Sequence, residues 1–219
     1  MSAPRLILLT TAQFYPTLAA VVEALTPARP LPALDQHDIV RHLDAEPGAP
    51  TRLIGFFTPV VVPGALLARL GTPAYNFHPG PPAYPGSSPI PFALYDGVDA
   101  YGVTVHVMAE RVDSGPIVAG SGFTVARPTG FHWLNQRTYK AGLRLFVTLA
   151  PALADTTREL PACGQHWSGT RRTKRQFEAM CRLAPDIAAD ELERRLASFG
   201  QAAPLELDLH GRTFVLKDR

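Results

Sequence analysis

The sequence predicts an α/β fold, in which helices flank a Rossmann-like, mainly parallel sheet and a small α+β extension follows at the C-terminus. Two short runs, Arg5–Thr10 and Leu53–Phe57, are almost wholly apolar, which is typical of strands buried on both faces of a parallel sheet. Between them, Tyr15–Thr26 carries apolar residues at helical spacing. Strands and helices that alternate in this way favour the α/β class.

The N-terminal half continues the same alternation. Pro27 and Pro30 end the first helix, because proline interrupts the helical hydrogen-bond ladder. The elements expected after it are a brief strand over Leu31–Leu34, a helix over Asp38–Ala45, a short helix over Gly64–Leu70 and a third central strand over Pro73–Phe77.

The pattern changes in the second half. Tyr101–Met108 alternates with period two, which predicts a strand that faces two environments. Its partner is expected from Gly115–Ala119 and Phe123–Val125, so the turn Ala109–Ser114 presents Asp113 at a strand end. Two helices are expected around this pair, one starting within Ser88–Leu94 and a long packed one over Trp133–Leu153.

Pro161 and Gly164 mark a boundary, which divides the chain into a first domain, residues 1–158, and a small extension, residues 159–219. The extension is expected to hold a basic stretch at Arg171–Arg175, a helix over Ala189–Ser198, and strands over Leu205–Leu209 and Thr213–Leu216 joined by a hairpin turn at His210-Gly211. A free edge of this hairpin offers a surface for pairing two subunits, so a homodimer is a candidate assembly.

Composition excludes several classes of protein. The 21 basic and 19 acidic side chains leave a net charge of +2, so no nucleic-acid partner is expected. Cys163 and Cys181 have no CxxC spacing, which fits a reduced compartment and gives no reason to expect a metal. The apolar run Leu6–Leu9 is too short for a signal peptide or a membrane span, so a cytoplasmic protein is expected.

The most informative segment is Asn76-Phe77-His78, followed by a loop rich in proline and later by Val112-Asp113-Ser114-Gly115-Pro116. Residues i and i+2 of an extended segment point the same way, so Asn76 and His78 are expected to converge on one substrate atom. An amide and an imidazolium can stabilise the oxyanion of an acyl transfer, and a carboxylate can tune the imidazole. Alone, however, a histidine after a strand is more often structural, and Asp-Ser-Gly is an ordinary turn.

The joint pattern is far more specific than its parts. Five segments follow one another along the chain: Asn76-Phe77-His78-Pro79, Tyr84-Pro85-Gly86, a helix with Ala93-Leu-Tyr-Asp-Gly97, Tyr101-Gly-Val-Thr104 and Val112–Pro116. This order resembles the formyltransferase family that uses 10-formyltetrahydrofolate, which includes methionyl-tRNA, glycinamide-ribonucleotide and amino-sugar formyltransferases. The resemblance is close over about residues 53 to 118 and loose on both flanks.

The resemblance implies a site. The family's catalytic trio falls on Asn76, His78 and Asp113: the amide and imidazole stabilise the oxyanion, the carboxylate keeps the imidazole charged, and a water relays protons. The pterin of the folate donor is held between two loops, largely by backbone groups. These loops here comprise Phe56, Phe57, Thr58, Pro59 and Val60, and Ala109, Glu110, Arg111 and Val112. Phe57 and Val60 could equally belong to the core.

Departures from the family pattern narrow the range of acceptors that the enzyme is expected to use. Thr10–Tyr15 replaces the glycine-rich phosphate loop of the glycinamide-ribonucleotide enzymes, and residues 159–219 are too few for the basic barrel of the methionyl-tRNA enzymes. The loop Pro79–Pro85 looks like that of small-molecule and amino-sugar N-formyltransferases. An acceptor pocket is therefore expected at Pro81, Pro82, Tyr84 and Trp167. Arg171 and Arg172 could pair with a nucleotide there or form an ordinary surface cluster.

Three functions stay open. The favoured one is an N-formyltransferase that acts on the primary amine of a small metabolite, with a nucleotide-linked amino sugar as the example. A 10-formyltetrahydrofolate hydrolase would need the same trio; the family's hydrolases usually carry a regulatory domain ahead of the catalytic one, which favours transfer here. The third is a catalytically silent folate-binding module on the same fold.

Overall fold

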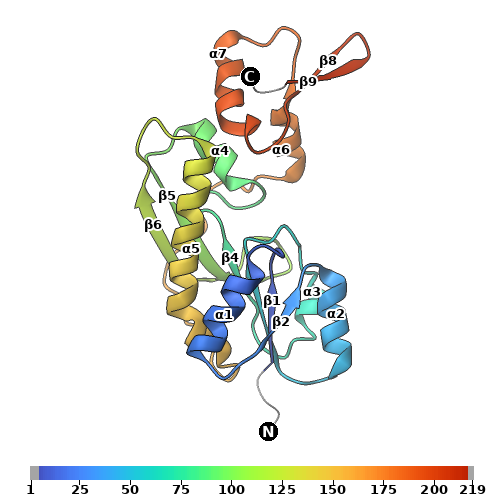
Figure 1. Cartoon of the computed structure of the whole chain (residues 1–219), viewed down its shortest axis with the longest axis vertical. Coiled ribbons are helices and arrows are strands. Elements are labelled where there is room, and N and C mark those ends of the chain that lie inside the picture. The colour runs from blue at the N-terminus through green and yellow to red at the C-terminus, as the bar shows by residue number, and fades with distance from the viewer. Residues whose placement is uncertain (1–4, 217–219) are drawn as a thin grey trace.

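The structure, a computed structural model, describes residues 5–216 and is built around one large mixed sheet (Figure 1). Its strands are β1 (Arg5–Leu9), β2 (Pro30–Ala33), β3 (Thr51–Phe56), β4 (Tyr75–His78), β5 (Ala100–Val107) and β6 (Ile117–Thr124), in the order β2-β1-β3-β4-β5-β6. β2, β1, β3 and β4 are parallel, whereas β5 and β6 are antiparallel to their neighbours. The predicted α/β class with a mainly parallel sheet is confirmed.

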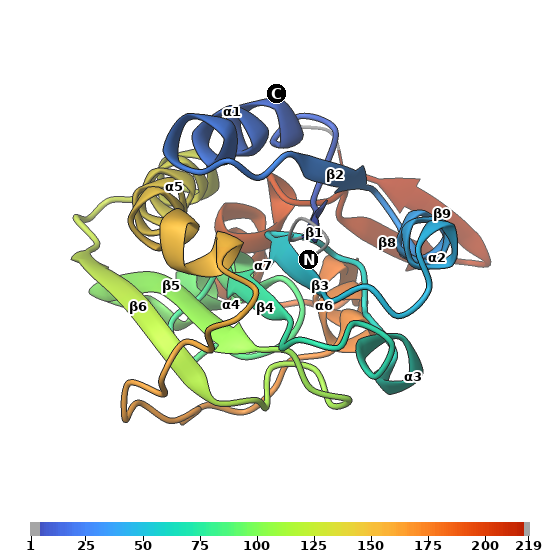
Figure 2. The same cartoon turned by 90° about the horizontal axis from the view of Figure 1, so that it is seen from below.

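Helices cover both faces of the parallel part (Figure 2). α1 (Tyr15–Leu25) and α5 (Phe131–Ala154) lie on one face, and α2 (Gln36–Ala45) and α3 (Gly64–Leu67) on the other. Alternate residues of β1 therefore pack on opposite sides, with Leu6 and Leu8 toward α1 and α5 and Ile7 and Leu9 toward α2. No helix within residues 5–216 combines the length and apolar character that a bilayer span requires.

The core beside α5 is aromatic. Phe56 of β3, Phe77 of β4 and Phe146 of α5 are fully buried, and the rings of Phe56 and Phe146 meet edge to face with centroids 5.8 Å apart. Both strands end next to this cluster, so the cluster supports the residues that follow their carboxyl ends.

Strand β5 is buried along almost its whole length. Tyr101, Val103 and Val105 alternate with Thr104 and His106, and all five are buried. The strand does face two environments, as its period-two pattern predicts, but both lie inside the protein. Its partner β6 is one continuous strand rather than two pieces, because Gly122 lies directly opposite Gly102 and the two strands approach closely there.

The chain between α5 and α6, called the 160–172 segment below, runs back along the large sheet. The Cys163 N–H donates to the Ile117 carbonyl of β6, and the Arg172 N–H donates to the Pro85 carbonyl of the loop after β4. The division of the chain at residue 158 stays a prediction, and residues 1–4 and 217–219 lie outside the described residues.

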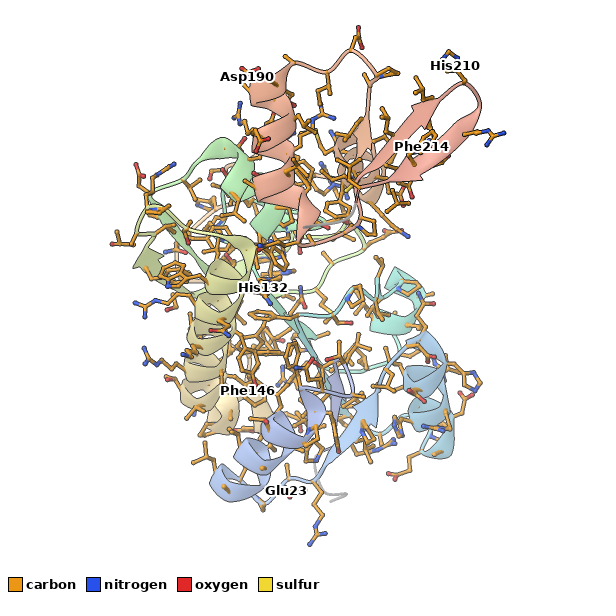
Figure 3. All side chains as sticks on the ribbon, turned by 45° about the horizontal axis from the view of Figure 1, so that its top comes forward. Glu23, His132, Phe146, Asp190, His210 and Phe214 are labelled. Atoms are coloured by element: carbon orange, nitrogen blue, oxygen red, sulfur yellow. The ribbon has the colours of Figure 1, made fainter. Side chains whose placement is uncertain are left out.

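The C-terminal unit packs on α4 (Pro89–Asp96), as Figure 1 shows. It contains α6 (Lys174–Cys181), α7 (Ala189–Arg195), the π-helical turn η1 (Leu196–Gly200), and a small sheet of β7 (Arg182–Leu183), β8 (Glu206–Leu209) and β9 (Arg212–Val215). The expected hairpin is β8–β9, with His210 labelled near its tip in Figure 3.

Two details of this unit differ from expectation. The helix expected over Ala189–Ser198 leaves α-helical geometry after Arg195 and continues as η1. The basic stretch is partly helical, because Thr173 and Gln176 form a capping box that starts α6 inside it.

Candidate active site

Four polar residues meet where β3, β4 and β5 lie side by side. Asn76 and His78 lie on β4, His106 lies on β5 directly opposite Asn76, and Asp113 lies in the β5–β6 connection. His78, His106 and Asp113 expose only 3%, 2% and 7% of their surface. Such buried polar groups need internal partners, and this set largely supplies its own.

Asp113 joins the two histidines. Its Oδ2 lies 3.3 Å from His78 Nδ1 and its Oδ1 lies 3.1 Å from His106 Nε2. The Gly86 N–H also donates to Oδ2 at 2.7 Å. The carboxylate is thus held on both oxygens, which favours its charged form.

The polar atoms of Asn76 and His78 do not converge in the way that their spacing predicts. His78 Nε2 donates to the Tyr84 carbonyl at 2.8 Å, so both nitrogens of this ring face protein acceptors. Asn76 Nδ2 lies 3.2 Å from His106 Nε2, and Asn76 Oδ1 is buried without a partner. A half-turn of this amide would let Oδ1 accept from His106 and leave Nδ2 free to donate to a ligand.

Burial opposes the charged histidine that the resemblance implies. Desolvation lowers the pKa of His78 below its ordinary value of 6.5, although the charge of Asp113 and the Tyr84 carbonyl act in the opposite direction. For Asp113, burial would raise the pKa, but the His106 hydrogen bond, the two imidazole charges and the Gly86 N–H together lower it. Near neutral pH the free protein therefore combines an ionised Asp113 with a largely neutral His78.

A cavity of about 610 Å³ opens beside this cluster and is lined by Asn76, His78, His106 and Asp113. Of the residues expected to hold folate, six line the cavity: Phe57, Thr58, Pro59, Val60, Ala109 and Val112. Glu110 and Arg111 do not, and Phe56 is fully buried in the aromatic core. Phe57 has φ +49°, a left-handed backbone conformation, and its ring stacks on that of Phe56 with centroids 4.4 Å apart while also lining the cavity.

Backbone strain gathers at this cavity. Phe57, Ser88 and Asp113 have φ of 49°, 52° and 48°, and all three line the cavity. The fourth non-glycine residue with positive φ among the described residues is His210, in the hairpin turn. Strained residues of this kind persist at binding and catalytic sites, where the surrounding structure holds them in place.

The residues expected to bind the acceptor do not line the cavity. Pro81, Pro82, Tyr84 and Trp167 are absent from its wall. The Tyr84 hydroxyl donates to Asp96, and the Pro82 carbonyl accepts from the Ser168 N–H. Arg172 lies over the Phe92 ring, 4.9 Å from its centroid. These contacts lie within the protein, and a role of these residues in acceptor binding stays a prediction.

Six further residues that the sequence analysis did not assign to a site also line the cavity. They are Phe14, Phe131, Asn135, Tyr139, Lys174 and Phe177. Phe131, Asn135 and Tyr139 recur every four residues on α5, and this helical spacing is the signal that could have revealed them. Lys174 and Phe177 come from α6 and carry no such signal, because the fold alone brings that helix to the cavity.

His106 was also missed. Its signal is the alternation within β5, where Thr104 and His106 interrupt an apolar strand on one side. Gly55 was missed as well: a Cβ there would lie 2.7 Å from Asn76 Oδ1 and 2.8 Å from Met108 Cε, so the glycine makes room for the amide. Within residues 5–216 no group of three or more His, Cys, Asp or Glu side chains is arranged to hold a metal ion.

Comparison with known proteins shows what this chain is similar to. Residues 49–149 match the formyl transferase family. A sugar N-formyltransferase from a Shewanella species is similar over 98% of this chain and 96% of its own, with 15% identity and a TM-score of 0.76. A 4-N formyltransferase from Francisella tularensis has the same coverage and TM-score at 14% identity. HypX from Aquifex aeolicus, in complex with tetrahydrofolic acid, is similar over 98% of this chain but 37% of its own, with 16% identity and a TM-score of 0.66.

Proposed function

We propose that this enzyme moves a formyl group from 10-formyltetrahydrofolate to the primary amine of a small metabolite, with a nucleotide-linked amino sugar as the favoured acceptor, and the match of residues 49–149 to the formyl transferase family supports this proposal. The observation that carries the proposal is the buried, hydrogen-bonded cluster of Asn76, His106, Asp113 and His78 in the wall of one cavity.

The cavity suits the donor. One wall consists of the loop Phe57–Val62 and part of the β5–β6 connection, including Met108, Ala109 and Val112. These segments offer apolar side chains and backbone groups, which fit a flat heteroaromatic ring that needs both stacking area and hydrogen bonds. The structural similarity to HypX from Aquifex aeolicus, which was solved in complex with tetrahydrofolic acid, supports this choice of donor.

The cluster supplies the groups that the reaction needs. A bond forms between the acceptor nitrogen and the formyl carbon, the bond from that carbon to the folate nitrogen breaks, and one proton passes from the first nitrogen to the second. Asn76 donates to the oxygen that becomes negative in between. Neutral His78 is held at Nδ1 by ionised Asp113; once a water replaces the Tyr84 carbonyl at Nε2, that nitrogen accepts the proton through the water and returns it to the departing nitrogen.

Lys174, Phe14 and Tyr139, which also line the cavity, suggest what the acceptor amine is attached to. Lys174 is the only Lys or Arg among the described residues that line the cavity, and it can pair with an anionic group such as a phosphate. Phe14 and Tyr139, stacked with centroids 4.8 Å apart, offer an aromatic surface for a base or sugar ring. The sugar N-formyltransferases among the relatives support this choice of acceptor.

A turnover assay tests the proposal against its alternatives. The protein is mixed with 10-formyltetrahydrofolate and a panel of amines that includes nucleotide-linked amino sugars, and both folate absorbance and formylated product are followed. Turnover that depends on an amine supports the transferase. Donor consumption without any amine would instead show a hydrolase, and donor binding without turnover would show a silent folate-binding module.

The homodimer is part of the proposal. Edge strand β9 of the small sheet carries Phe214 and Val215, which are 50% and 53% exposed. Such an edge can pair with another strand. Sedimentation velocity of the full chain and of Phe214→Asp would show a dimer and its loss.

A further inference from the structure

Trp167 lies against both imidazoles of the cluster. Its ring meets that of His78 edge to face at 5.6 Å between centroids and that of His106 at 5.1 Å, with interplanar angles of 78° and 79°. Because Trp167 does not line the cavity, it covers the histidines away from the wall where substrates bind.

Trp167 also holds the loop that carries Asp113. Its Nε1–H donates to the Gly115 carbonyl at 3.0 Å, two residues beyond Asp113. Asp113 needs such support because its φ of 48° is costly for a residue with a side chain. Gly115 is packed so closely on β5 that a Cβ there would lie 2.0 Å from the Val107 carbonyl oxygen.

The 160–172 segment is itself fastened to the loop after β4. The Ser168 N–H donates to the Pro82 carbonyl at 3.1 Å, and a Cβ on Gly169 would lie 1.7 Å from the Ala83 carbonyl oxygen. Farther along, Arg172 bridges to Gly86, whose N–H donates to Asp113. The segment therefore contacts the cluster directly through Trp167 and is linked to it a second time through Gly86.

We propose that Trp167 is a positioning residue of this enzyme, whose indole shields the imidazoles of His78 and His106 from water and tethers the loop that carries Asp113. The proposal rests on the proposed function in one respect, which is that the cluster is catalytic. It reassigns Trp167 from acceptor binding to control of the proton-transfer groups.

Shielding has a measurable consequence. The ionisable groups that face His78 are Asp113 from the β5–β6 connection and His106 from β5, whereas Tyr84 faces it with a carbonyl and Trp167 with an uncharged ring. Burial is the largest cause that lowers the pKa of His78. Loss of the indole would admit water and reduce the desolvation of the His78 ring. The pKa of His78 should therefore rise, and less of the neutral base should remain near pH 7.

Titration of the histidine ring signals by NMR tests this directly. In Trp167→Ala we expect the pKa of His78 to rise by about one unit, within the range that burial produces. The acid limb of the kcat/KM profile should move by the same amount, with the KM for the formyl donor changed less than about twofold, since Trp167 lies outside the cavity. Trp133→Ala, which removes a 42% exposed tryptophan on α5, is the matched control and should change neither quantity. An unchanged His78 titration in folded Trp167→Ala would overturn the proposal.

A second measurement covers the case in which Trp167→Ala does not fold. The chain has two tryptophans, so in Trp133→Phe only Trp167 emits. Protonation of an imidazole in edge contact should quench that emission, with a midpoint that moves to lower pH in Trp133→Phe/Asp113→Asn, because the carboxylate that favours the charged ring is gone. Emission that stays constant over the pH range in which the His78 ring signals titrate by NMR in Trp133→Phe would contradict the contact. Neither titration needs substrate, so the two proposals can fail separately. If no amine supports turnover, the titrations still test the role of Trp167. If neither titration shows the expected change, formyl transfer can still be measured.

Discussion

At the scale of single residues, Asp113 is the group on which the cluster depends, since its two oxygens contact His78, His106 and the Gly86 N–H. Asp113→Asn keeps the shape but removes the charge that orients both imidazoles. We expect kcat to fall by about 10²-fold or more while the Kd for folate changes little. Steady-state kinetics and a folate titration measure the two effects.

The control for this prediction is Asp99→Asn, which changes an exposed ion pair with Arg127 and should behave as wild type. Lost folate binding with normal chemistry would refute the assignment.

The second residue-scale prediction concerns pH and stability. The folded-state pKa of His78 lies below its ordinary value of 6.5, mainly because of burial. The unfolded chain then binds more protons than the folded one, so this contribution is complete above pH 6.5 and declines as pH falls toward the folded pKa. Asp113, whose pKa is also lowered, loses its contribution only as pH falls below the ordinary value of 3.8.

Urea unfolding between pH 7.5 and 5 should therefore show a wild-type free energy of unfolding that decreases with acid. His78→Gln should remove much of this slope, whereas the exposed His166→Gln should leave it in place. Equal slopes in wild type and His78→Gln would mean that His78 is charged in the folded protein.

At the scale of elements, Gly55 of β3 has no side chain and so leaves room for the Asn76 amide of the neighbouring strand β4. A Cβ on Gly55 would approach Asn76 Oδ1 to 2.7 Å, so Gly55→Ala must displace the amide. We expect the free energy of unfolding to fall by about 1–3 kcal/mol, as overpacking does, and kcat to fall about tenfold or more, as loss of an oxyanion donor does. In Gly122→Ala the new Cβ would meet the Tyr101 carbonyl oxygen at 3.8 Å, an ordinary contact, which makes it the control. Full activity in Gly55→Ala would show that the amide is not needed where it lies.

Helix α6 links the C-terminal unit to the cavity through Lys174. Lys174→Ala should raise the KM for an acceptor that carries phosphate about tenfold, because one charge-assisted contact is lost, and leave kcat and folate binding nearly unchanged. The neighbouring Arg175→Ala removes an equal charge from the same helix outside the cavity wall and should have little effect. Acceptor kinetics on both variants test this. The assignment fails if the two KM values rise equally.

At the scale of the whole molecule, the aromatic core beneath the cavity joins α5 to the sheet. Phe146 is fully buried between Phe56 and Phe77, and Figure 3 labels it on α5. Phe146→Ala should lower the free energy of unfolding by about 3–5 kcal/mol. Val147→Ala, at the next position but 42% exposed, should cost less than about 0.5 kcal/mol. Urea unfolding gives both values, and a loss below about 1 kcal/mol for Phe146→Ala would show that this core does not support the sheet.

Local patterns predicted most of the elements correctly, because apolar periodicity reports which side of a strand or helix is buried. The helix expected over Trp133–Leu153 is α5, and the strands expected around Leu53–Phe57 and Pro73–Phe77 are β3 and β4. The patterns failed where a remote partner decides the outcome. α6 was hidden because it begins inside a basic stretch and its apolar residues farther on pack on α4, and Ser198 belongs to η1 rather than to a regular helix.

The sequence by itself determined the class of fold and a motif order that resembles the formyltransferases, because both depend on residues near one another in the chain. It also named Asn76, His78 and Asp113, which all line the cavity. Only the tertiary structure brought His106 between Asn76 and Asp113, placed Trp167 on the imidazoles and moved the expected acceptor residues out of the cavity wall. The physical reason is that burial and hydrogen-bond partners come from strand register and from a segment that returns after α5, and neither is encoded in local spacing.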